Sequence, residues 1–376
     1  FNNIVIFIRF NDQDEFTDQI SLYHDMFNDV SSSANSMYNY FKEVSYNQLE
    51  ITTSFYPESS AGAIVSYRDS QPRDYYVPYS ATNTIGYEGD DARTEREHTL
   101  LKNAVNSIAD QVPSSLNIDE DGDGYVDNVC FIIQGETEGW SSLLWPHRWA
   151  LYSETASING KRVWDYNFQL DASVYNGVLA HEMFHSLGAP DLYHYSYDGL
   201  DPAGAWDLMG ANQRVPQHMG AYMKFKYGGW IDSIPEITEP GTYELNQLAS
   251  STNNFYKIAS PYSSKEYFLV EYRKREGAFE SSLPGEGLLV YRINPTVNGN
   301  ADGPPDEVYI YRPNGTLTEN GSISMAGFSG NSGRTSINDF TNPSSFLEDD
   351  SPGGLSIKNI GTIGETISFE VQMGCD

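Results

Sequence analysis

Two histidines and a glutamate in one short segment have the spacing of a catalytic metal site. The segment reads His181-Glu182-Met183-Phe184-His185. On an α-helix, residues four apart differ by about 40° around the axis, so both imidazoles can reach one zinc ion at roughly 2.0–2.1 Å. Glu182 lies about 100° round the helix, where it can contact a metal-bound water without binding the metal. Zinc lowers the pKa of such a water to about 7, and a carboxylate base makes it a nucleophile. The spacing therefore predicts zinc ligands His181 and His185 and a general base, Glu182.

The residues that follow favour Asp191 as the third ligand. Gly188 stands where a helix would end, and Pro190 prevents its continuation, so the turn returns the chain toward the first two ligands. No glutamate occurs between Glu182 and Glu236, which argues against a glutamate ligand from a later helix. Three protein ligands would leave the fourth position open for water, as in catalytic zinc sites. The alternatives for the third ligand are Asp207, which ranks next, and His194, Asp198 and Asp201. For the whole segment, the alternative is an ordinary helix with two surface histidines.

A second segment, residues 119–127, has the pattern of a calcium loop. Carboxylates occupy loop positions 1, 3, 5 and 9, with glycine at position 6 for the sharp turn and a backbone carbonyl at position 7. The predicted calcium residues are Asp119, Asp121, Asp123, Tyr125 and Asp127. Position 12 is Cys130 instead of the bidentate glutamate of an EF-hand, so another acid or water would complete the shell. The alternative is a solvated acidic turn. A weaker signal for a second calcium site comes from Asp302, Asp306 and Glu307.

Size and charge restrict the class of protein. The 376 residues suit two domains, or one domain with large elaborations. The chain carries 22 Lys+Arg against 52 Asp+Glu, a formal net charge of −30. Such a field repels phosphate backbones and anionic lipid, so we expect no nucleic-acid partner. No apolar stretch approaches the roughly 18–20 residues of a membrane span, so no membrane insertion is expected. We expect a soluble monomer.

The two cysteines, Cys130 and Cys375, lie too far apart in the sequence to indicate a disulfide framework. Cys130 is in an apolar run and is expected to be buried; a Cys130–Cys375 bridge is the alternative. Because the chain begins at Phe1 and not at a methionine, removal of a preceding signal segment or propeptide is compatible with the sequence.

The first 235 residues alternate between strand and helix patterns, which predicts a mixed α/β domain. Strands are expected at residues 4–8, 49–55, 126–134 and 162–168, and helices at 34–44, 94–112 and 173–187. After Pro235 the pattern changes to short strands separated by Pro, Gly, Asn and Ser, with no convincing helix. Strands are expected to begin near residues 242, 255, 267, 287, 308 and 366, with long loops over 312–354. We predict a catalytic domain at 1–235 and an all-β sandwich-like domain at 236–376, with the boundary near 234–241.

The segment HEMFHSLGAPDLY resembles the extended zinc motif of the immune inhibitor A-like metallopeptidases, a secreted bacterial family related to the metzincins. In that family an aspartate replaces the third metzincin histidine. Four further segments resemble the family: residues 41–51, 144–151, 216–230 and 285–294. AWDLMG (205–210) resembles its methionine-turn loop. The similarity covers nearly the whole chain.

The resemblance implies a zincin-like fold and a secreted endopeptidase, made with a propeptide, that cleaves extracellular proteins or peptides. It supports His181, His185 and Asp191 as zinc ligands and Glu182 as the base, and it places Met209 beneath the metal. A plain core methionine is the alternative for Met209. His147 is expected to be structural and not catalytic. His218, Tyr193 and Tyr222 are the unranked candidates to donate a hydrogen bond to the oxyanion.

Two other functions are compatible with the residues. One is a binding module, in which the β-domain recognises a glycan or protein and catalysis is weak or lost. The other is a zinc hydrolase that acts on a non-peptide bond. The intact set of ligands and base argues against the binding module, because a purely binding protein does not need to retain both.

Overall fold

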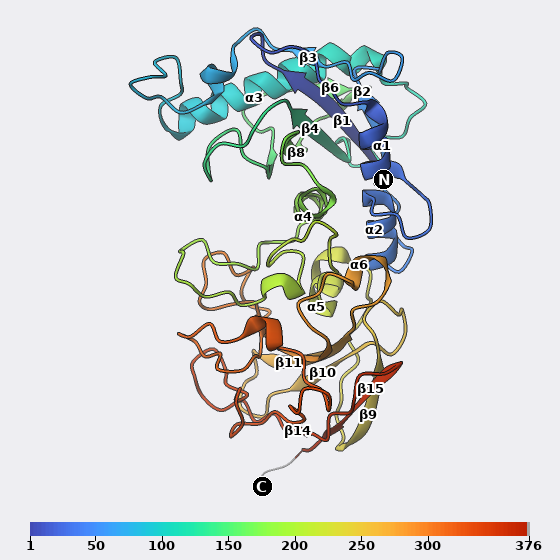
Figure 1. Ribbon diagram of the computed structural model, residues 1–376, viewed down its shortest axis with the longest axis vertical. Coiled ribbons are helices and arrows are strands. Elements are labelled where there is room, and N and C mark those ends of the chain that lie inside the picture. The colour runs from blue at the N-terminus through green and yellow to red at the C-terminus, as the bar shows by residue number, and fades with distance from the viewer. Residues whose placement is uncertain (374–376) are drawn as a thin grey trace. The chain divides into compact units, whose positions relative to one another are not determined.

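A computed structural model describes residues 1–373 and confirms a mixed α/β protein with several sheets (Figure 1). The chain forms two compact units. The first contains residues 1–42 and 49–186, and the second contains residues 43–48 and the chain from 187 onward. No helix within residues 1–373 is both long and apolar enough to cross a membrane. The more specific assignment to the zincin fold stays a prediction.

The first unit is built on a mixed sheet in the order β2-β1-β4-β8-β5, with β3 also paired to β1. All pairs are parallel except β5, which runs antiparallel to β8 at the edge of the sheet. Strand β1 is fully buried from Ile4 to Ile8, because its central position leaves both faces covered. The strands are β1 (Asn2–Arg9), β2 (Thr52–Tyr56), β3 (Tyr67–Arg68), β4 (Asn128–Ile133), β5 (His147–Ala150) and β8 (Asp165–Leu170); β6 (Ser157–Ile158) and β7 (Lys161–Arg162) form a separate hairpin.

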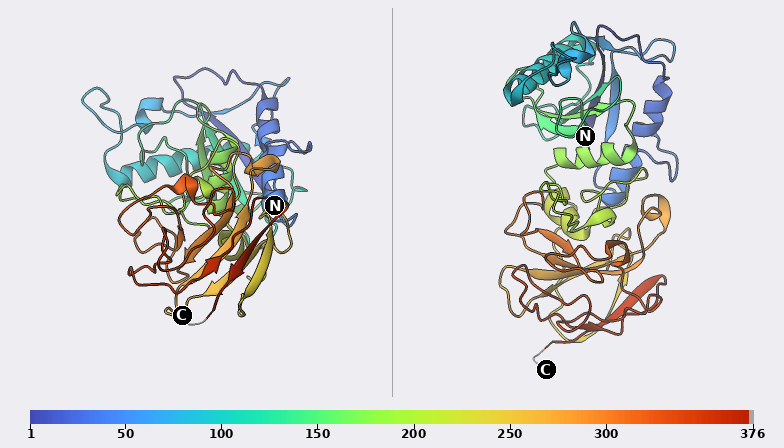
Figure 2. Two further views of the ribbon diagram at one scale, coloured as in Figure 1. Left: turned by 60° about the horizontal axis from the view of Figure 1, so that its bottom comes forward. Right: turned by 60° about the vertical axis from the view of Figure 1, so that its left-hand side comes forward.

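Helices cover both faces of this sheet (Figure 2). Helix α3 (Gly89–Ile108) packs on the face that carries Ile4, Ile6 and Ile8 and shares one hydrophobic cluster with them. On the opposite face, α1 (Ile20–Asn28) brings the ring of Tyr23 to 4.9 Å from that of Phe7. Helix α4 (Asn176–Ser186) packs against β8 and β5. The sheet is therefore the rigid support for α4.

A buried row of asparagines fixes the C-terminal end of α4 on that sheet. Asn128 of β4 donates to Asn3 of β1 (2.8 Å) and accepts from Asn167 of β8 (2.9 Å). The hydroxyl of Ser186, the last residue of α4, also donates to Asn128 (3.0 Å). A buried amide that lacks a hydrogen-bond partner costs several kcal/mol of folding free energy. Moving the helix end would break the bonds of this row, so the row fixes its position.

The remaining helical segments of the first half are α2 (Met37–Val44), η1 (Arg73–Tyr76) and η2 (Ala109–Gln111). The predicted helices and strands are present, with shifted ends. Helix α3 begins at Gly89, five residues before the predicted start, and α4 begins three residues later than predicted. The sequence analysis missed α1 and the edge strand β5, which is only four residues long.

The second unit has two antiparallel sheets, ordered β10-β11-β12-β13 and β14-β15-β9. Residues from both sheets, among them Val270, Leu288 and Phe369, share one hydrophobic cluster, which confirms a β-rich C-terminal part. One short helix, α6 (Gly277–Glu280), corrects the expectation that this part has none. Residues 312–354 contain only the 3-10 turn η5 (Ile323–Met325) and isolated bridges. The strands are β9 (Gly241–Asn246), β10 (Phe255–Ala259), β11 (Tyr267–Arg273), β12 (Gly287–Ile293), β13 (Val308–Ile310), β14 (Ile357–Lys358) and β15 (Thr366–Val371).

Residues 187–235 belong to the compact unit of the β-sheets, whereas the sequence analysis placed them with residues 1–186. This segment is largely irregular, with a 3-10 turn η3 (Gly204–Trp206), a short helix α5 (Ala221–Met223) and a π-helix η4 (Lys224–Gly228). The proline-rich break near 234–241 is therefore not the place where the contacts divide. The domain limits in the functional sense stay a prediction.

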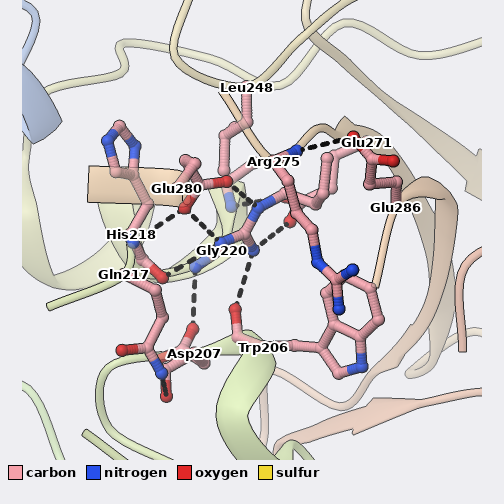
Figure 3. A network of polar contacts seen from close by, with 12 residues as sticks. Trp206, Asp207, Gln217, His218, Gly220, Leu248, Glu271, Arg275, Glu280 and Glu286 are labelled. Carbon is pink, nitrogen blue, oxygen red and sulfur yellow. Dashed lines mark hydrogen bonds and ion pairs between the residues drawn. The ribbon is translucent and has the colours of Figure 1, made fainter. Parts of the chain in front are cut away.

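A buried charged network explains that grouping (Figure 3). The guanidinium of Arg273, on β11, binds both carboxylate oxygens of Glu280 (2.6 and 2.7 Å) and the carbonyl of Trp206 (2.8 Å). The carboxylate of Glu271, also on β11, accepts the backbone N–H of Ala221 (2.8 Å). These side chains are fully buried or nearly so. Irregular backbone around 206–221 is thus attached to strand β11 by ionic hydrogen bonds, which are stronger than neutral ones.

The edge strand β5 is attached to helix α3 by a different pair, the buried Glu97 and the partly buried His147. His147 Nε2 lies 2.8 Å from Glu97 Oε1, and His147 Nδ1 lies 2.5 Å from the Trp145 carbonyl. Burial opposes the charged imidazole, but the Glu97 charge and hydrogen bond outweigh it and raise the pKa of His147. Burial likewise disfavours the Glu97 carboxylate, but His147 and the Tyr166 hydroxyl hold the pKa of Glu97 below its ordinary value. Both ring nitrogens have acceptors, in agreement with the expected structural role of His147.

This pair predicts a pH window of stability. Because the pKa of His147 is raised in the folded state, protonated His147 stabilises the protein fully below pH 6.5, the ordinary histidine pKa. This stabilisation is lost as the pH rises through the pKa of His147 in the folded protein. Because the pKa of Glu97 is lowered in the folded state, ionised Glu97 stabilises the protein fully above pH 4.5, the ordinary glutamate pKa. This stabilisation is lost as the pH falls through the pKa of Glu97 in the folded protein. Glu97→Gln should therefore cost on the order of 3 kcal/mol of unfolding free energy between those two values, and less at alkaline pH. Denaturant unfolding across pH 4–9 measures this, with the exposed Glu95→Gln on the same helix as control. Equal losses at pH 5.5 and 9 would contradict the ionic origin.

Candidate metal centre

Helix α4 places His181 and His185 on one side, one turn apart. Every residue from Asn176 to Phe184 is buried, so the helix is packed on all sides around His181, while His185 at its end is partly buried. The helix ends at Ser186, and Gly188 follows with φ +104°, a left-handed backbone conformation that L side chains rarely adopt. The predicted glycine turn is confirmed, and the chain continues directly through Pro190 to Asp191.

The structure brings His181, His185 and Asp191 together as a group that could hold a metal ion. Each offers one ligand atom, and these atoms all lie within 4.8 Å of one another. The two Nε2 atoms are 3.1 Å apart and the imidazole planes are perpendicular. Two nitrogen ligands about 2.05 Å from a tetrahedral ion would be about 3.3 Å apart, so the imidazoles are already close to that geometry. His181 and Asp191 are each 6% exposed, which limits competition from bulk water.

A tyrosine that the sequence analysis did not single out contacts this group. The hydroxyl of Tyr195 donates to Asp191 Oδ2 at 2.5 Å, while the tyrosine ring is 44% exposed. The ring centroid of Tyr193 lies 5.6 Å from that of Tyr195. The only available signal was that Tyr195 follows Asp191 by four residues, and this spacing has no meaning outside a helix.

The alternative third ligands have other partners in the structure. Both oxygens of Asp207 accept backbone N–H groups, from Met209 (2.8 Å) and Gly220 (2.7 Å). Burial raises the pKa of Asp207 to about 6 despite these bonds. His194 lies between two carboxylates, Asp198 at 2.8 Å and Asp306 at 2.6 Å, and Asp201 accepts the N–H of Gly204. None of the four alternatives belongs to the His181 group among residues 1–373.

Glu182 lies on α4, directly after His181 in the sequence. It is 7% exposed. Its negative charge contributes to the raised pKa values of Cys130 on β4 and His147 on β5, after burial for Cys130 and after burial and Glu97 for His147. The predicted role of Glu182 as a general base stays a prediction.

Met209 is fully buried, and its backbone adjoins the third ligand. Its carbonyl accepts the N–H of Leu192 at 3.0 Å, so the predicted methionine loop contacts the residue that follows Asp191. Whether its side chain forms a floor beneath a metal stays a prediction.

Two of the three predicted oxyanion donors have other roles in the structure. His218 is fully buried between Glu43 (2.8 Å) and Lys224 (3.1 Å), and burial lowers the pKa of its imidazole well below the ordinary value. The hydroxyl of Tyr222 donates to Glu307 at 2.7 Å and is buried. The remaining candidate, Tyr193, is half-buried.

The acidic loop forms the second group that could hold a metal ion. Ligand atoms of Asp119, Asp121 and Asp123 lie within 4.8 Å of one another. Asp119 is buried, and its Oδ1 has no hydrogen-bond partner. Its other oxygen accepts the N–H of Gly124 (3.1 Å) and the ammonium of Lys161 (2.6 Å). An unsatisfied buried carboxylate oxygen beside two further carboxylates suits a hard cation.

The other predicted residues of that loop are arranged differently. Asp127 accepts the backbone N–H of Glu120 (2.9 Å) and of Asn2 (3.0 Å), so its carboxylate connects the loop to strand β1 and is not part of the three-aspartate group. Tyr125 donates its N–H to Asp123, and its side chain is 39% exposed.

The weakly predicted second calcium site is not supported. Asp306 binds His194, and Glu307 accepts the hydroxyls of Tyr222 and Tyr227. With Asp302 they form no metal-binding group among residues 1–373.

Cys130 is buried in β4, as predicted, and forms no disulfide with any described residue. Cys375, its partner in the alternative bridge, lies outside the described residues.

Comparisons with known proteins identify no family for this chain. A scan against models of known protein families finds no match, and a search of curated proteins finds no significant match. The resemblance to the immune inhibitor A-like metallopeptidases therefore stays a prediction.

The geometry predicts a graded loss of metal binding. His181→Ala and His185→Ala should each empty the site, and Asp191→Asn should weaken it by more than the roughly 10–100-fold that changes beside a ligand usually cost. Elemental analysis after gel filtration, with competition against a chromophoric chelator, measures both the amount and the affinity of bound metal. The exposed Asp232→Asn is the matched control. If Asp191→Asn bound metal as tightly as the control, Asp191 would not be a ligand.

Proposed function

We propose that this protein is a secreted, zinc-dependent endopeptidase of the immune inhibitor A-like type. The observation that carries the proposal is the convergence of His181, His185 and Asp191 within 4.8 Å, directly beside Glu182 on the same helix. Catalytic zinc sites characteristically combine three protein ligands with an open position and an adjacent carboxylate. Protein or peptide substrates, the extracellular location and a monomeric state belong to the same proposal.

The donor set favours zinc. Two imidazole nitrogens and one carboxylate oxygen are typical zinc ligands. Two histidines and one carboxylate also bind Fe²⁺ in some oxygenases, so elemental analysis of the purified protein distinguishes the two ions. Glu182 argues for zinc hydrolysis, because a base next to the ligands has a role in activating water and none in holding the metal.

Bound zinc would act as a Lewis acid and lower the pKa of a coordinated water to about 7. Glu182 would accept a proton from that water and then deliver it to the leaving amine as the peptide bond breaks. Tyr193, near Asp191 in the chain, is the remaining candidate to donate a hydrogen bond to the carbonyl oxygen as it becomes negatively charged.

The edge strand β5 favours peptide over other substrates. Strand β5 is the last strand of its sheet within residues 1–373, and helix α4 packs against it. A strand with one unpaired side can bind an extended peptide through backbone hydrogen bonds. A non-peptide substrate would make no use of that edge. The competing proposal, a β-domain that binds glycan or protein with little catalysis, does not account for the conjunction of three ligands and a base.

For the acidic loop we propose structural calcium. Oxygen ligands at alternate positions are what Ca²⁺ requires, and the unsatisfied Asp119 Oδ1 supplies an inward-facing ligand atom. The loop leads directly into strand β4, so calcium there would stabilise the sheet that supports α4.

Removal of the base should separate catalysis from metal binding. Glu182→Gln keeps the size of the side chain but not its basicity, so kcat on a denatured protein substrate should fall by about 10²–10⁴ while zinc stays bound. Digestion of casein and of a peptide library, with and without chelator, measures the activity, and elemental analysis measures the zinc. The exposed Glu239→Gln is the control. Near-native proteolysis by zinc-loaded Glu182→Gln would disprove the assigned role, and absence of cleavage by the native protein with full zinc would favour the binding module.

Calcium should stabilise the protein by mass action. At 100 times its Kd, a ligand that binds only the folded state contributes about 2.7 kcal/mol, or roughly 5–10 °C in the Tm of a unit of this size. Asp119→Asn and Asp121→Asn should abolish the response, whereas the exposed Asp110→Asn should keep it. Differential scanning calorimetry of calcium-free protein titrated with Ca²⁺ measures the shift. If both loop variants responded like the control, calcium would bind elsewhere.

A further inference from the structure

The third ligand lies in a short irregular segment, residues 191–195, that needs an external support. The segment follows the end of α4 and contains no regular secondary structure. A ligand on such a segment binds a metal tightly only if the backbone and the carboxylate are both held before the metal arrives. The contacts that the segment makes with the rest of the second unit are therefore informative.

Asn300, in the connection between β12 and β13, holds the backbone of the segment. Its N–H donates to the Asp191 carbonyl at 2.9 Å, and its side-chain amide donates to the Leu192 carbonyl at 3.1 Å. The same side chain binds both backbone groups of Val308 on β13, at 2.8 and 3.2 Å. Asn300 is fully buried, and its side chain therefore links the ligand segment to a strand of the β-sheet.

Neighbouring contacts extend this support along the segment. The N–H of Tyr195 donates to the Ala301 carbonyl at 2.9 Å, next to Asn300 in the same connection. The neighbouring Gly299 must be small, because an added Cβ would lie 2.9 Å from the Asp191 carbonyl. The segment and the connection thus run in direct backbone contact, with Asn300 in the middle.

Tyr195 holds the carboxylate itself. Its hydroxyl donates to Asp191 Oδ2 at 2.5 Å. A carboxylate that binds a metal through one oxygen usually has a hydrogen-bond donor on the other, and this donor sets its orientation. Asn300 therefore fixes the position of the Asp191 backbone, and Tyr195 fixes the orientation of the Asp191 carboxylate.

We propose that Asn300 and Tyr195 are positioning residues for the third metal ligand, and that through Asn300 the β-rich unit prepares the metal centre. This inference rests on the proposed function, because it assumes that Asp191 ligates the metal. It assigns the β-rich unit a role that the sequence left open. Neither residue is proposed to bind the metal.

The test measures metal affinity and not catalysis. In a Glu182→Gln parent, which excludes self-digestion, Tyr195→Phe and Asn300→Ala should each raise the Kd for Zn²⁺ by about 10–100-fold in competition with a chromophoric chelator. The exposed neighbours supply matched controls, Tyr197→Phe and Asn298→Ala, which should bind like the parent. Thermal unfolding of the metal-free proteins shows whether each variant folds.

Cobalt provides the readout that a merely structural role would not change. With Co²⁺ in place of zinc, Tyr195→Phe should alter the visible absorption bands that report coordination geometry, while its metal-free Tm stays that of the parent. A parent that binds no metal would overturn the proposed function and this inference together. A parent that binds zinc, with unchanged Kd and spectrum in Tyr195→Phe and Asn300→Ala, would overturn this inference alone.

Discussion

The candidate centre depends on one constraint, that a carboxylate on irregular backbone must lie within a few ångströms of two imidazoles on a rigid helix. The two imidazoles are positioned by α4, which is buried from Asn176 to Phe184 and whose last residue is held by Asn128 and Asn167. The aspartate is harder to position, because residues without regular hydrogen bonds have no intrinsic position. Three kinds of support address this: the left-handed turn at Gly188, the backbone bonds to Asn300 and the Tyr195 hydroxyl.

The parts of the site that follow from local rules were predictable from sequence. Two histidines at i and i+4 lie on one helical face whatever the rest of the fold does, and a glycine followed by a proline ends a helix for local steric reasons. His181, His185, Gly188 and Asp191 could therefore be placed before any coordinates. The strands and helices of the first 186 residues followed from hydrophobic periodicity for the same reason, and only their ends shifted.

What sequence could not supply depends on contacts between distant residues. Tyr195 and Asn300 matter through hydrogen bonds to Asp191, and nothing in the local pattern marks an asparagine 109 positions away as its support. His218 and Tyr222 were reasonable oxyanion donors by type, but Glu43, Lys224 and Glu307 already engage them. The contacts divide after Ser186 and not at the proline-rich break for a similar reason, because that break is a local signal whereas the Arg273 network is not.

The Arg273 network also gives a reason for the many buried charges in the second unit. Arg273 fixes Trp206, the adjacent Asp207 binds the N–H of Met209, and the carbonyl of Met209 accepts the N–H of Leu192. A continuous series of hydrogen bonds thus runs from strand β11 to the residue after the third ligand. Apolar side chains of equal volume could stabilise the fold as well or better, since buried ion pairs gain little net free energy. They could not fix irregular backbone at one position, because hydrophobic contact is non-directional and tolerates sliding. Directional hydrogen bonds to Arg273 and Asp207 prevent the backbone from sliding. A metal centre with one ligand on a loop requires that the backbone be fixed in this way.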